Sequence, residues 1–337
     1  MTASPLVYIA MVNYGRADDT IECLKSLHGL TGVDFRVVLV DNDSPDGSVQ
    51  YLNAWFDAGE PDGSGWITLG RVGQASFDLK FVASPDNTGF AGGCNIGIRE
   101  ALADPDCTHV WLLNNDTLVE PDSLSALIHR FDRDDRVGIC GSTLVYHQPE
   151  DIVQGCGGRF DMVSGRGTPI GAFRERGTLP APDEVEREMD YVIGASMLVS
   201  MDLIRSVGEM DERYFLYFEE LDWALRARRG GFALGWAPDS VVIHKEGAAI
   251  GTSTRGRPSV MATYFMTVGY LRLIRAHRVG VLPLALALSL ARAVKWALAG
   301  DQAHSRTVVQ GIRDFLQSPS RYVAGSYHGM GSKIEGQ

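Results

Sequence analysis

The sequence predicts an α/β fold with a mostly parallel central sheet, and three apolar segments carry this prediction. Residues 6–12 and 35–40 have the buried, β-branched character of strands in a parallel sheet. Between them, apolar side chains recur at helical spacing, at Ile21, Leu24 and Leu27. A strand, a helix and a second strand in so short a stretch form a βαβ unit, which joins parallel strands. Residues 110–113 repeat the buried-strand pattern.

Composition places the chain among ordinary globular proteins. It has 337 residues, of which 45% are apolar and 22% are charged, so we expect one large domain or two ordinary ones. A net charge of −11 argues against a general nucleic-acid binder. The start of the chain lacks the charged and apolar parts of a signal peptide, and no apolar run reaches the roughly 18–20 residues that span a bilayer.

The cysteines indicate a reducing, cytosolic setting. They are odd in number and scattered, and none forms a C-x-x-C pair, so neither a disulfide framework nor a zinc site is expected; they are Cys23, Cys94, Cys107, Cys140 and Cys156.

The remaining elements follow from the same apolar patterns. Further short strands are predicted at residues 81–83, 137–141, 191–199, 232–236 and 240–243, and further helices at 96–102, 124–131 and 201–207. Residues 57–80 have few periodic apolar positions and predict an irregular or hairpin excursion. Residues 146–188 are rich in Gly, Pro and charge, and so long a stretch is more often functional than idle, so we interpret it as an acceptor-side or lid segment.

Two acidic loops follow predicted strands. In an open α/β sheet, ligands bind outside the carboxyl ends of the strands. Asp116 follows the strand at 110–113 with amide neighbours, which suits a divalent cation held against a phosphate. The loop from Asp41 to Ser48 could supply acceptors for a base or a ribose hydroxyl. The plainer interpretation of both loops is a polar turn that caps a helix.

A glycine-rich stretch spans residues 86–97. Its three close glycines would let the backbone approach a ligand and point amide N–H groups at it. The stretch is not a Walker A loop, because no Gly-Lys-Ser/Thr follows, and its glycine spacing does not match the dinucleotide fingerprint.

Three acids gather where a helix is predicted to begin. On that helix Glu219, Asp222 and Arg226 share one face, whereas Glu220 lies about 100° away, so Glu220 and Asp222 cannot point at the same atom. The helix dipole alone would explain one acid there, but poorly explains three. His244 ends a predicted strand. A lone His is more often a surface or core residue, but the acidic site already proposed makes it a candidate metal ligand.

The last part of the chain changes character. Residues 262–300 predict amphipathic helices, and they are basic within an acidic protein. This suits an interfacial helix pair that rests on an anionic membrane leaflet. A helical hairpin that packs on the main domain or in a homo-oligomer is equally compatible with the pattern.

The ordered motifs resemble those of the family 2 glycosyltransferases, which have a GT-A fold, and most of all the rhamnosyltransferase-like branch that builds bacterial surface polysaccharides. The motifs are Val-Asn-Tyr at 12–14, Val-Asp-Asn-Asp-Ser-Pro-Asp-Gly-Ser at 40–48, Asn-Thr-Gly-Phe-Ala-Gly-Gly-Cys-Asn-Ile-Gly at 87–97, Leu-Asn-Asn-Asp at 113–116, Phe-Glu-Glu-Leu-Asp-Trp at 218–223, and His244. The resemblance covers residues 5–250. It implies a catalytic domain at 1–250, with a nucleotide-binding part at about 1–118 and an acceptor-binding part at about 119–250, followed by a helical extension at 251–337.

The resemblance also implies residue roles. Asp116 and His244 would bind Mn²⁺ or Mg²⁺, with Asn114 in place of the first acid of the family's Asp-x-Asp motif. Glu220 would be the catalytic base, and Asp222 would meet the acceptor or orient the loop. The nucleotide-sugar would lie against Asn13, Asp41, Asn42, Ser44, Asn87, Gly89, Asn95, Asn115 and Asp116.

The implied activity is inverting, metal-dependent transfer of a sugar from a nucleotide-diphosphate donor to a glycan or lipid-linked acceptor. dTDP-rhamnose is the first expected donor, and a UDP-sugar the next. The expected place is the cytoplasmic face of the plasma membrane. Two other functions are compatible with parts of the pattern. One is a non-catalytic nucleotide-sugar-binding subunit of an assembly complex, and the other is a sugar nucleotidyltransferase, although the Gly-rich, basic start of the latter is missing here.

Overall fold

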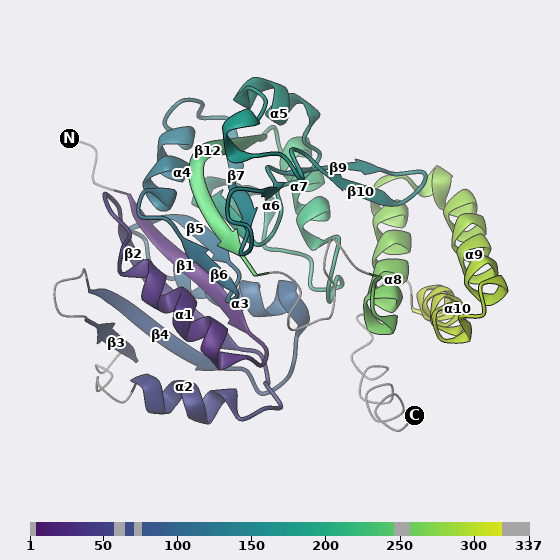
Figure 1. The fold of residues 1–337 in the computed structure, drawn as a ribbon, viewed down its shortest axis with the longest axis horizontal. Coiled ribbons are helices and arrows are strands. Elements are labelled where there is room, and N and C mark those ends of the chain that lie inside the picture. Colours follow the sequence, from purple (N-terminus) through teal and green to yellow (C-terminus); the bar gives the residue numbers. More distant parts are fainter. Residues whose placement is uncertain (1–4, 57–64, 71–75, 246–256, 319–337) are drawn as a thin grey trace.

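The computed structural model describes residues 5–56, 65–70, 76–245 and 257–318. One large sheet, with strand order β3-β4-β2-β1-β5-β11-β7-β12-β6, runs through the main body of the molecule, and a helical unit stands at one side of it (Figure 1). Its strands are β1 (Leu6–Asn13), β2 (Asp34–Asp41), β3 (Trp66–Leu69), β4 (Phe77–Ala83), β5 (Cys107–Leu113), β6 (Thr117–Val119), β7 (Val137–Tyr146), β11 (Ser196–Ser200) and β12 (Ala233–His244), with β8 (Val153–Gly155) paired to β7.

The expected α/β architecture is confirmed, and the sheet has two parts. β4, β2, β1 and β5 are parallel neighbours, as the βαβ pattern predicts. Beyond β5 the sheet is mixed, because β11 runs antiparallel to both β5 and β7, and β6 runs antiparallel to β12. The carboxyl ends of β1, β2 and β5 therefore meet at one edge, where the loops that carry the candidate site begin.

Helices cover both faces of the sheet. On one face, α1 (Ala17–Leu27), α2 (Ser48–Phe56) and α4 (Ser123–Phe131) bury their apolar sides in one core cluster. On the other face, α3 (Gly89–Leu102), α6 (Met201–Val207) and α7 (Glu219–Arg229) pack in a second cluster. The two clusters consist of buried apolar side chains, and burial of each Val, Leu, Ile, Phe or Met among them stabilises the fold by about 1.5–3 kcal/mol.

The glycine-rich stretch is helical, which corrects the expectation of a ligand-binding loop followed by a helix at 96–102. α3 begins at Gly89, so the glycines lie within its first turns. A β-carbon at Gly93 would stand 2.8 Å from Val12 Cγ1, and one at Gly97 would stand 2.6 Å from Ala10 Cβ. These glycines thus let α3 lie directly on β1, which is a packing role.

Several predicted strands have different bounds. The strand expected at 191–199 begins at Ser196, the strands expected at 81–83 and 137–141 are longer, and those expected at 232–236 and 240–243 are the single strand β12. The pairing of β12 with β7 shifts register between Ala237 and Val241, where Pro238 cannot donate to the ladder. Within residues 57–80, the described part contains β3 and the start of β4, which pair as an antiparallel hairpin.

The segment at 146–188 is more ordered than its composition suggested. It contains β8, an antiparallel hairpin of β9 (Gly158–Asp161) and β10 (Arg166–Pro169), a 3-10 turn at Arg176–Thr178, and α5 (Pro182–Glu188). Figure 1 shows the hairpin reaching from the main body to the C-terminal helices. At its turn, the Tyr270 hydroxyl donates to the carbonyls of Met162, at 3.1 Å, and Val163, at 2.7 Å.

In the C-terminal region, the described residues 257–318 form three α-helices with a core of their own. They are α8 (Val260–His277), α9 (Leu282–Leu298), which follows a short 3-10 turn at Val279–Val281, and α10 (Gln302–Gln317). By length and composition, the helical stretch Val279–Leu298, with mean hydropathy 1.6, is long and apolar enough to cross a membrane. This corrects the expectation that no segment of the chain meets that criterion. The domain boundary at residue 250 stays a prediction.

Candidate functional site

Asp116 and His244 come together at the edge of the sheet, although they are far apart in the chain. β6 pairs antiparallel with β12 so that Thr117 lies opposite His244, and Lys245 N–H donates to the Asp116 carbonyl at 3.0 Å. This pairing also brings the two side chains together, with His244 Nε2 at 3.3 Å from Asp116 Oδ1. Both side chains are largely buried, with 12% and 14% of their surfaces exposed. The strand register therefore builds the predicted pair.

The neighbouring groups suit a divalent cation. Gln154 Oε1 lies 2.9 Å from His244 Nδ1, and a proton on Nδ1 would turn the Nε2 lone pair toward Asp116. Two acceptors that face each other at such a distance repel unless a proton or a cation lies between them. In addition, Asn114 Oδ1 is buried and has no hydrogen-bond partner among the described residues, while its Nδ2 lies 3.5 Å from His244 Nε2. A carboxylate, an imidazole and a free amide oxygen form a donor set that fits Mn²⁺ or Mg²⁺.

The charge of this pair is also consistent with a cation site. When a proton rather than a cation lies between the two side chains, burial opposes ionisation of Asp116, but the hydrogen bond and charge of the protonated His244 outweigh it and lower the pKa of Asp116. The carboxylate is thus ionised at neutral pH. No group of three or more His, Cys, Asp or Glu side chains suited to a metal occurs in the part of the chain that the structure describes.

Asp41, Asn13 and Ser44 form a buried network at the ends of β1 and β2. Asn13 is paired with Asp41 across the parallel strands, and its Nδ2 donates to Asp41 Oδ2 at 2.6 Å. Ser44 donates to the same carboxylate through its hydroxyl, at 2.7 Å, and through its backbone N–H, at 3.0 Å. Asp41 is fully buried. These contacts shape the loop, and its exposed acids are Asp43 and Asp46.

Asn115 and Asn42 connect this loop to its neighbours. Asn115 Nδ2 donates to Asn13 Oδ1 at 3.2 Å and to Thr20 Oγ1 at 2.9 Å, which ties the loop after β5 to β1 and α1. Asn42 donates to Asn87 Oδ1 at 3.1 Å and to the Gly89 carbonyl at 2.9 Å. All the predicted nucleotide-sugar residues except Asn95 and Asp116 therefore belong to one hydrogen-bonded network at the sheet edge, joined through the bond from Asn42 N–H to the Asn13 carbonyl. Whether they contact a nucleotide-sugar stays a prediction.

Gly89 is needed for a close backbone contact. Its φ is +73°, and a β-carbon there would stand 2.3 Å from the Phe215 carbonyl oxygen, which accepts from Phe90 N–H at 2.8 Å. No other residue fits this position without moving the segment before α7. Gly89 thus sets how closely the start of α3 approaches the loop that carries the acids.

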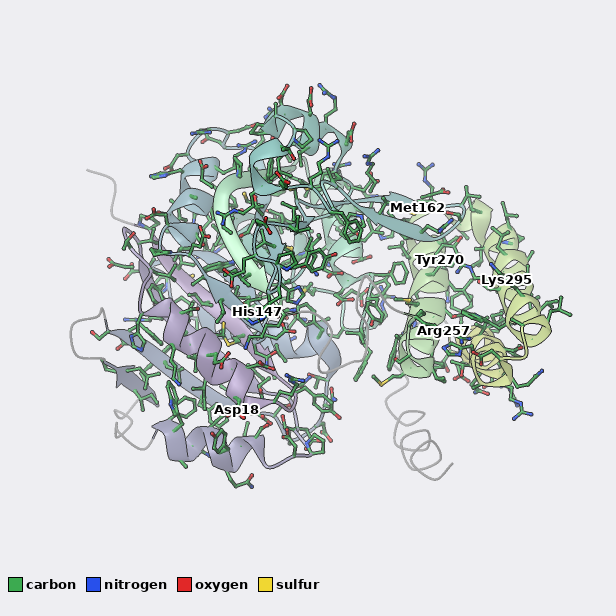
Figure 2. The ribbon with its side chains drawn as sticks, viewed as in Figure 1. Asp18, His147, Met162, Arg257, Tyr270 and Lys295 are labelled. Atoms are coloured by element: carbon green, nitrogen blue, oxygen red, sulfur yellow. The ribbon has the colours of Figure 1, made fainter. Side chains whose placement is uncertain are left out.

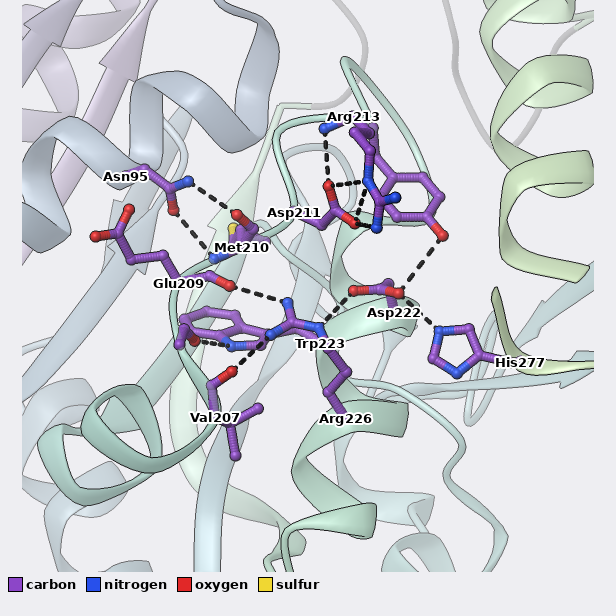
Figure 3. Close-up of polar contacts among 12 residues, drawn as sticks. Asn95, Val207, Glu209, Met210, Asp211, Arg213, Asp222, Trp223, Arg226 and His277 are labelled. Carbon is purple, nitrogen blue, oxygen red and sulfur yellow. Dashed lines mark hydrogen bonds and ion pairs between the residues drawn. The ribbon is translucent and has the colours of Figure 1, made fainter. Parts of the chain in front are cut away.

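Asn95 holds the same loop from farther along α3. Its side-chain amide donates to the Met210 carbonyl at 2.9 Å, and its Oδ1 accepts from Met210 N–H at 3.1 Å (Figure 3). The same amide also donates to Glu212 Oε1 at 3.0 Å. Asn95 is buried, and each polar atom of its amide has a protein partner. Its observed contacts are therefore with the protein loop, and contact with a donor sugar stays a prediction.

Glu220 stands at the first turn of α7 and faces the chain just before β11. Its Oε1 accepts from Gly194 N–H at 3.3 Å. Burial raises the pKa of Glu220, and burial together with the charge of Glu220 raises the pKa of its neighbour Glu219 well above the ordinary range. Glu219 is 2% exposed with Oε2 unpartnered among the described residues, which suits a neutral carboxyl. A carboxylate with a raised pKa is a competent general base.

Asp222 points away from Glu220 and toward the C-terminal helices. Its Oδ2 pairs with Arg226 Nε at 2.7 Å, and its Oδ1 lies 2.7 Å from His277 Nε2 on α8 (Figure 3). Arg226 also donates to the carbonyls of Val207 and Glu209. Because both carboxylate oxygens have protein partners, Asp222 connects α7 to α8, and Glu220 is the stronger candidate for the base. The predicted divergence of the two side chains is consistent with this arrangement.

Sequence reasoning missed two residues that shape the site. Gln154, which orients His244, lies in the segment expected as a lid, and nothing in its neighbourhood marked it. Gly194, which leaves room for the Glu220 carboxylate, was taken as part of a strand. The signal that could have found it is a glycine among the apolar residues just before β11.

Two models of glycosyltransferase families match this chain. The model of "Glycosyl transferase family 2" matches residues 8–155, and that of "Glycosyl transferase family group 2" matches residues 109–331, which is more than half of the chain. A low-salt glycan biosynthesis hexosyltransferase, Agl10, of Haloferax volcanii is 25% identical over 242 residues, or 71% of this chain and 66% of the relative. This chain thus spans just under two thirds of that protein.

A second relative and two solved structures to which this chain is similar are also glycosyltransferases by name. An N-acetylglucosaminyl-diphospho-decaprenol L-rhamnosyltransferase of Mycobacterium tuberculosis is 24% identical over 260 residues, or 72% of this chain and 77% of the relative. A mannosyltransferase of Pyrobaculum calidifontis with GDP-Man and Mn²⁺ has a TM-score of 0.54 at 14% identity, covering 99% of this chain and 81% of its own. GalNAc-T7 with UDP, GalNAc and Mn²⁺ has a TM-score of 0.57 at 12% identity, covering 96% and 59%. The chain therefore has the GT-A fold.

Proposed function

Because the chain belongs to the family 2 glycosyltransferases, we propose that it transfers a sugar from a nucleotide-diphosphate donor with inversion at the anomeric carbon. The pairing of Asp116 with His244, at 3.3 Å and from distant parts of the chain, is the observation that carries this proposal. It supplies a place for a cation beside the polar edge of the sheet, while Glu220 supplies a base on a separate element.

The residues divide the reaction between them. Asp116 and His244 would hold a divalent cation, with Asn114 Oδ1 near, and such an ion neutralises negative charge on a departing diphosphate. Glu220 accepts the proton of the acceptor hydroxyl as that oxygen attacks the anomeric carbon. A single base opposite the leaving group gives direct displacement, so no protein nucleophile is required. Gly194 N–H and the turn of α7 keep the Glu220 carboxylate in place.

The finer assignment of substrates is also our proposal. The mycobacterial relative bears the name of a rhamnosyltransferase that acts on a diphospho-decaprenol-linked sugar, and the Haloferax relative that of a hexosyltransferase. We propose dTDP-rhamnose as the first donor to test and a UDP-hexose as the second, with a lipid-linked or growing glycan as acceptor. With such an acceptor, we propose that the reaction belongs to bacterial surface polysaccharide synthesis at the cytoplasmic face of the plasma membrane.

A nucleotide-sugar screen tests the proposal. With Mn²⁺ present, dTDP-rhamnose or a UDP-hexose should raise the melting temperature, and the rise should vanish with EDTA and in Asp116→Asn. Products formed from the stabilising donor should include free nucleoside diphosphate. Release of pyrophosphate instead would identify a nucleotidyltransferase, and binding with neither hydrolysis nor transfer to any glycan-lipid would identify a non-catalytic subunit. Either result overturns the proposed function.

A further inference from the structure

The C-terminal helices carry an apolar face that the main body does not cover. On α9, apolar side chains are largely exposed, with 47% of Leu284, 49% of Leu290, 57% of Val294 and 85% of Leu298 accessible. At about 100° per residue, these four positions fall within an arc of about 120°. The opposite side of α9 is buried through small residues, Ala285, Ser289 and Ala293. We call the exposed arc of Leu284, Leu290, Val294 and Leu298 the α9 face.

The neighbouring helix α8 does not share this exposure. From Thr267 to Ile274 its residues are continuously buried, and it packs between the main body and the other two helices. Figure 2 shows Tyr270 of α8 next to Met162 of the β9–β10 hairpin, and Lys295 on α9. Of the residues 262–300 for which membrane contact was predicted, those of α9 are therefore the stronger candidates, because the buried part of α8 cannot reach a membrane.

The helical unit that carries the α9 face is basic, and Lys295 lies at the edge of this face, about 20° around α9 from Leu284. Residues 260–317 contain seven Arg and Lys residues and two Asp residues, a net charge of +5 with His neutral, in a chain of net charge −11. Both acids are engaged within the unit. Asp301 pairs with Arg257 and caps α10, and Asp314 accepts from Tyr264 at 2.8 Å and from Gln310 at 2.7 Å. The exposed charges of the three helices are cations, namely Arg275, Arg278, Lys295, Arg306 and Arg313.

We propose that the α9 face lies in the headgroup region of an anionic lipid bilayer. An exposed apolar arc beside clustered Arg and Lys side chains is the pattern by which a helix inserts one face while its cations contact anionic headgroups. A second copy of the chain fits less well, because a two-fold contact through this face would bring like charges together. Insertion across the bilayer would require α9 to leave the core that it shares with α8 and α10. This proposal does not rest on the glycosyltransferase activity.

Vesicle binding by the full chain tests the proposal without any substrate. We expect sedimentation with vesicles of mixed phosphatidylcholine and phosphatidylglycerol, much weaker sedimentation with phosphatidylcholine alone, and release as salt rises. In Leu290→Ser/Val294→Ser, binding should fall roughly 30-fold, because about half of each side chain is available for insertion. Lys295→Glu/Arg306→Glu should lower it about tenfold or more.

Matched controls and oligomer measurements complete the test. Tyr51→Ser removes a comparably exposed side chain, 54% accessible, from α2, and should leave vesicle binding unchanged. All three variants change only exposed residues, and an unchanged melting temperature will verify that each one folds. Equal binding to neutral and anionic vesicles would overturn the proposal. Resistance of the bound protein to extraction by both salt and alkali would also overturn the proposal, because it indicates a helix that spans the membrane. A chain that binds no vesicles but forms a dimer, which Leu290→Ser/Val294→Ser dissociates, would show that the α9 face contacts a second copy instead.

Discussion

Replacing Gly194 by Ala should displace the Glu220 carboxylate without unfolding the protein. A β-carbon at Gly194 would stand 2.6 Å from Glu220 Oε1, whereas ordinary contact begins at 3.4 Å, so the carboxylate must move by about 0.8 Å. The clash falls on the end of a flexible side chain, and Gly194 does not have a positive φ, so we expect stability to change by less than about 1 kcal/mol. A displacement of this size should lower kcat roughly 100-fold.

The assay compares kcat, the Kd for donor and the melting temperature in Gly194→Ala with those in Gly177→Ala. Gly177 also lacks a positive φ, and a β-carbon there would meet nothing within 4 Å, so it is a matched control with full activity. We expect Gly194→Ala to lose kcat while its affinity for donor stays within a factor of about three. Full activity in Gly194→Ala, or a loss of activity that comes from donor affinity alone, would refute the role given to Glu220.

Three further predictions follow from the same geometry. Burial raises the pKa of Glu220, and the base acts when deprotonated, so kcat should fall as pH drops through a pKa above the ordinary 4.5. Glu220→Gln should be inactive at every pH. A kcat that stays constant down to pH 4.5 would contradict the prediction. His277→Ala removes a partner of buried Asp222, so it should lower the free energy of unfolding, measured in urea, by about 1–3 kcal/mol. The control His129→Ala changes an exposed residue and should leave this free energy unchanged. Equal stability of the two variants would refute the contact between α7 and α8 through Asp222 and His277. Asn114→Asp adds a carboxylate beside Asp116, so it should tighten Mn²⁺ binding about tenfold by calorimetry, and unchanged affinity would place the ion elsewhere.

The sheet could be predicted from the sequence because its central strands are continuous apolar runs. Residues 6–12 and 35–40 are wholly or mostly buried, and the polar residues that follow them lie at the predicted edge of the sheet. The sequence pattern marked Asp116 and His244 each as a candidate metal ligand, and the resemblance to a family assigned them to one ion. The physical cause of their pairing is the register of β6 with β12, which no local pattern encodes.

The errors came from residues whose role depends on distant partners. The glycines at 89–97 were taken as a loop, because their contacts with Val12 and Ala10 on β1 are tertiary. Asp222 could not be told from Glu220 as the base by residue type. What separates them is His277, whose position on α8 depends on the packing of the C-terminal helices. The sequence pattern marked α8 and α9 as similar helices, and only their packing shows which one is exposed.

Calorimetric titration of Mn²⁺ in the presence of a nucleoside diphosphate tests the central claim most directly. If Asp116 and His244 share one cation, Asp116→Asn and His244→Ala should each weaken binding by about 10- to 100-fold or more, while His129→Ala binds as the unaltered chain does. Mn²⁺ affinity that is unchanged in His244→Ala would show that the imidazole is not a ligand, and would contradict the account.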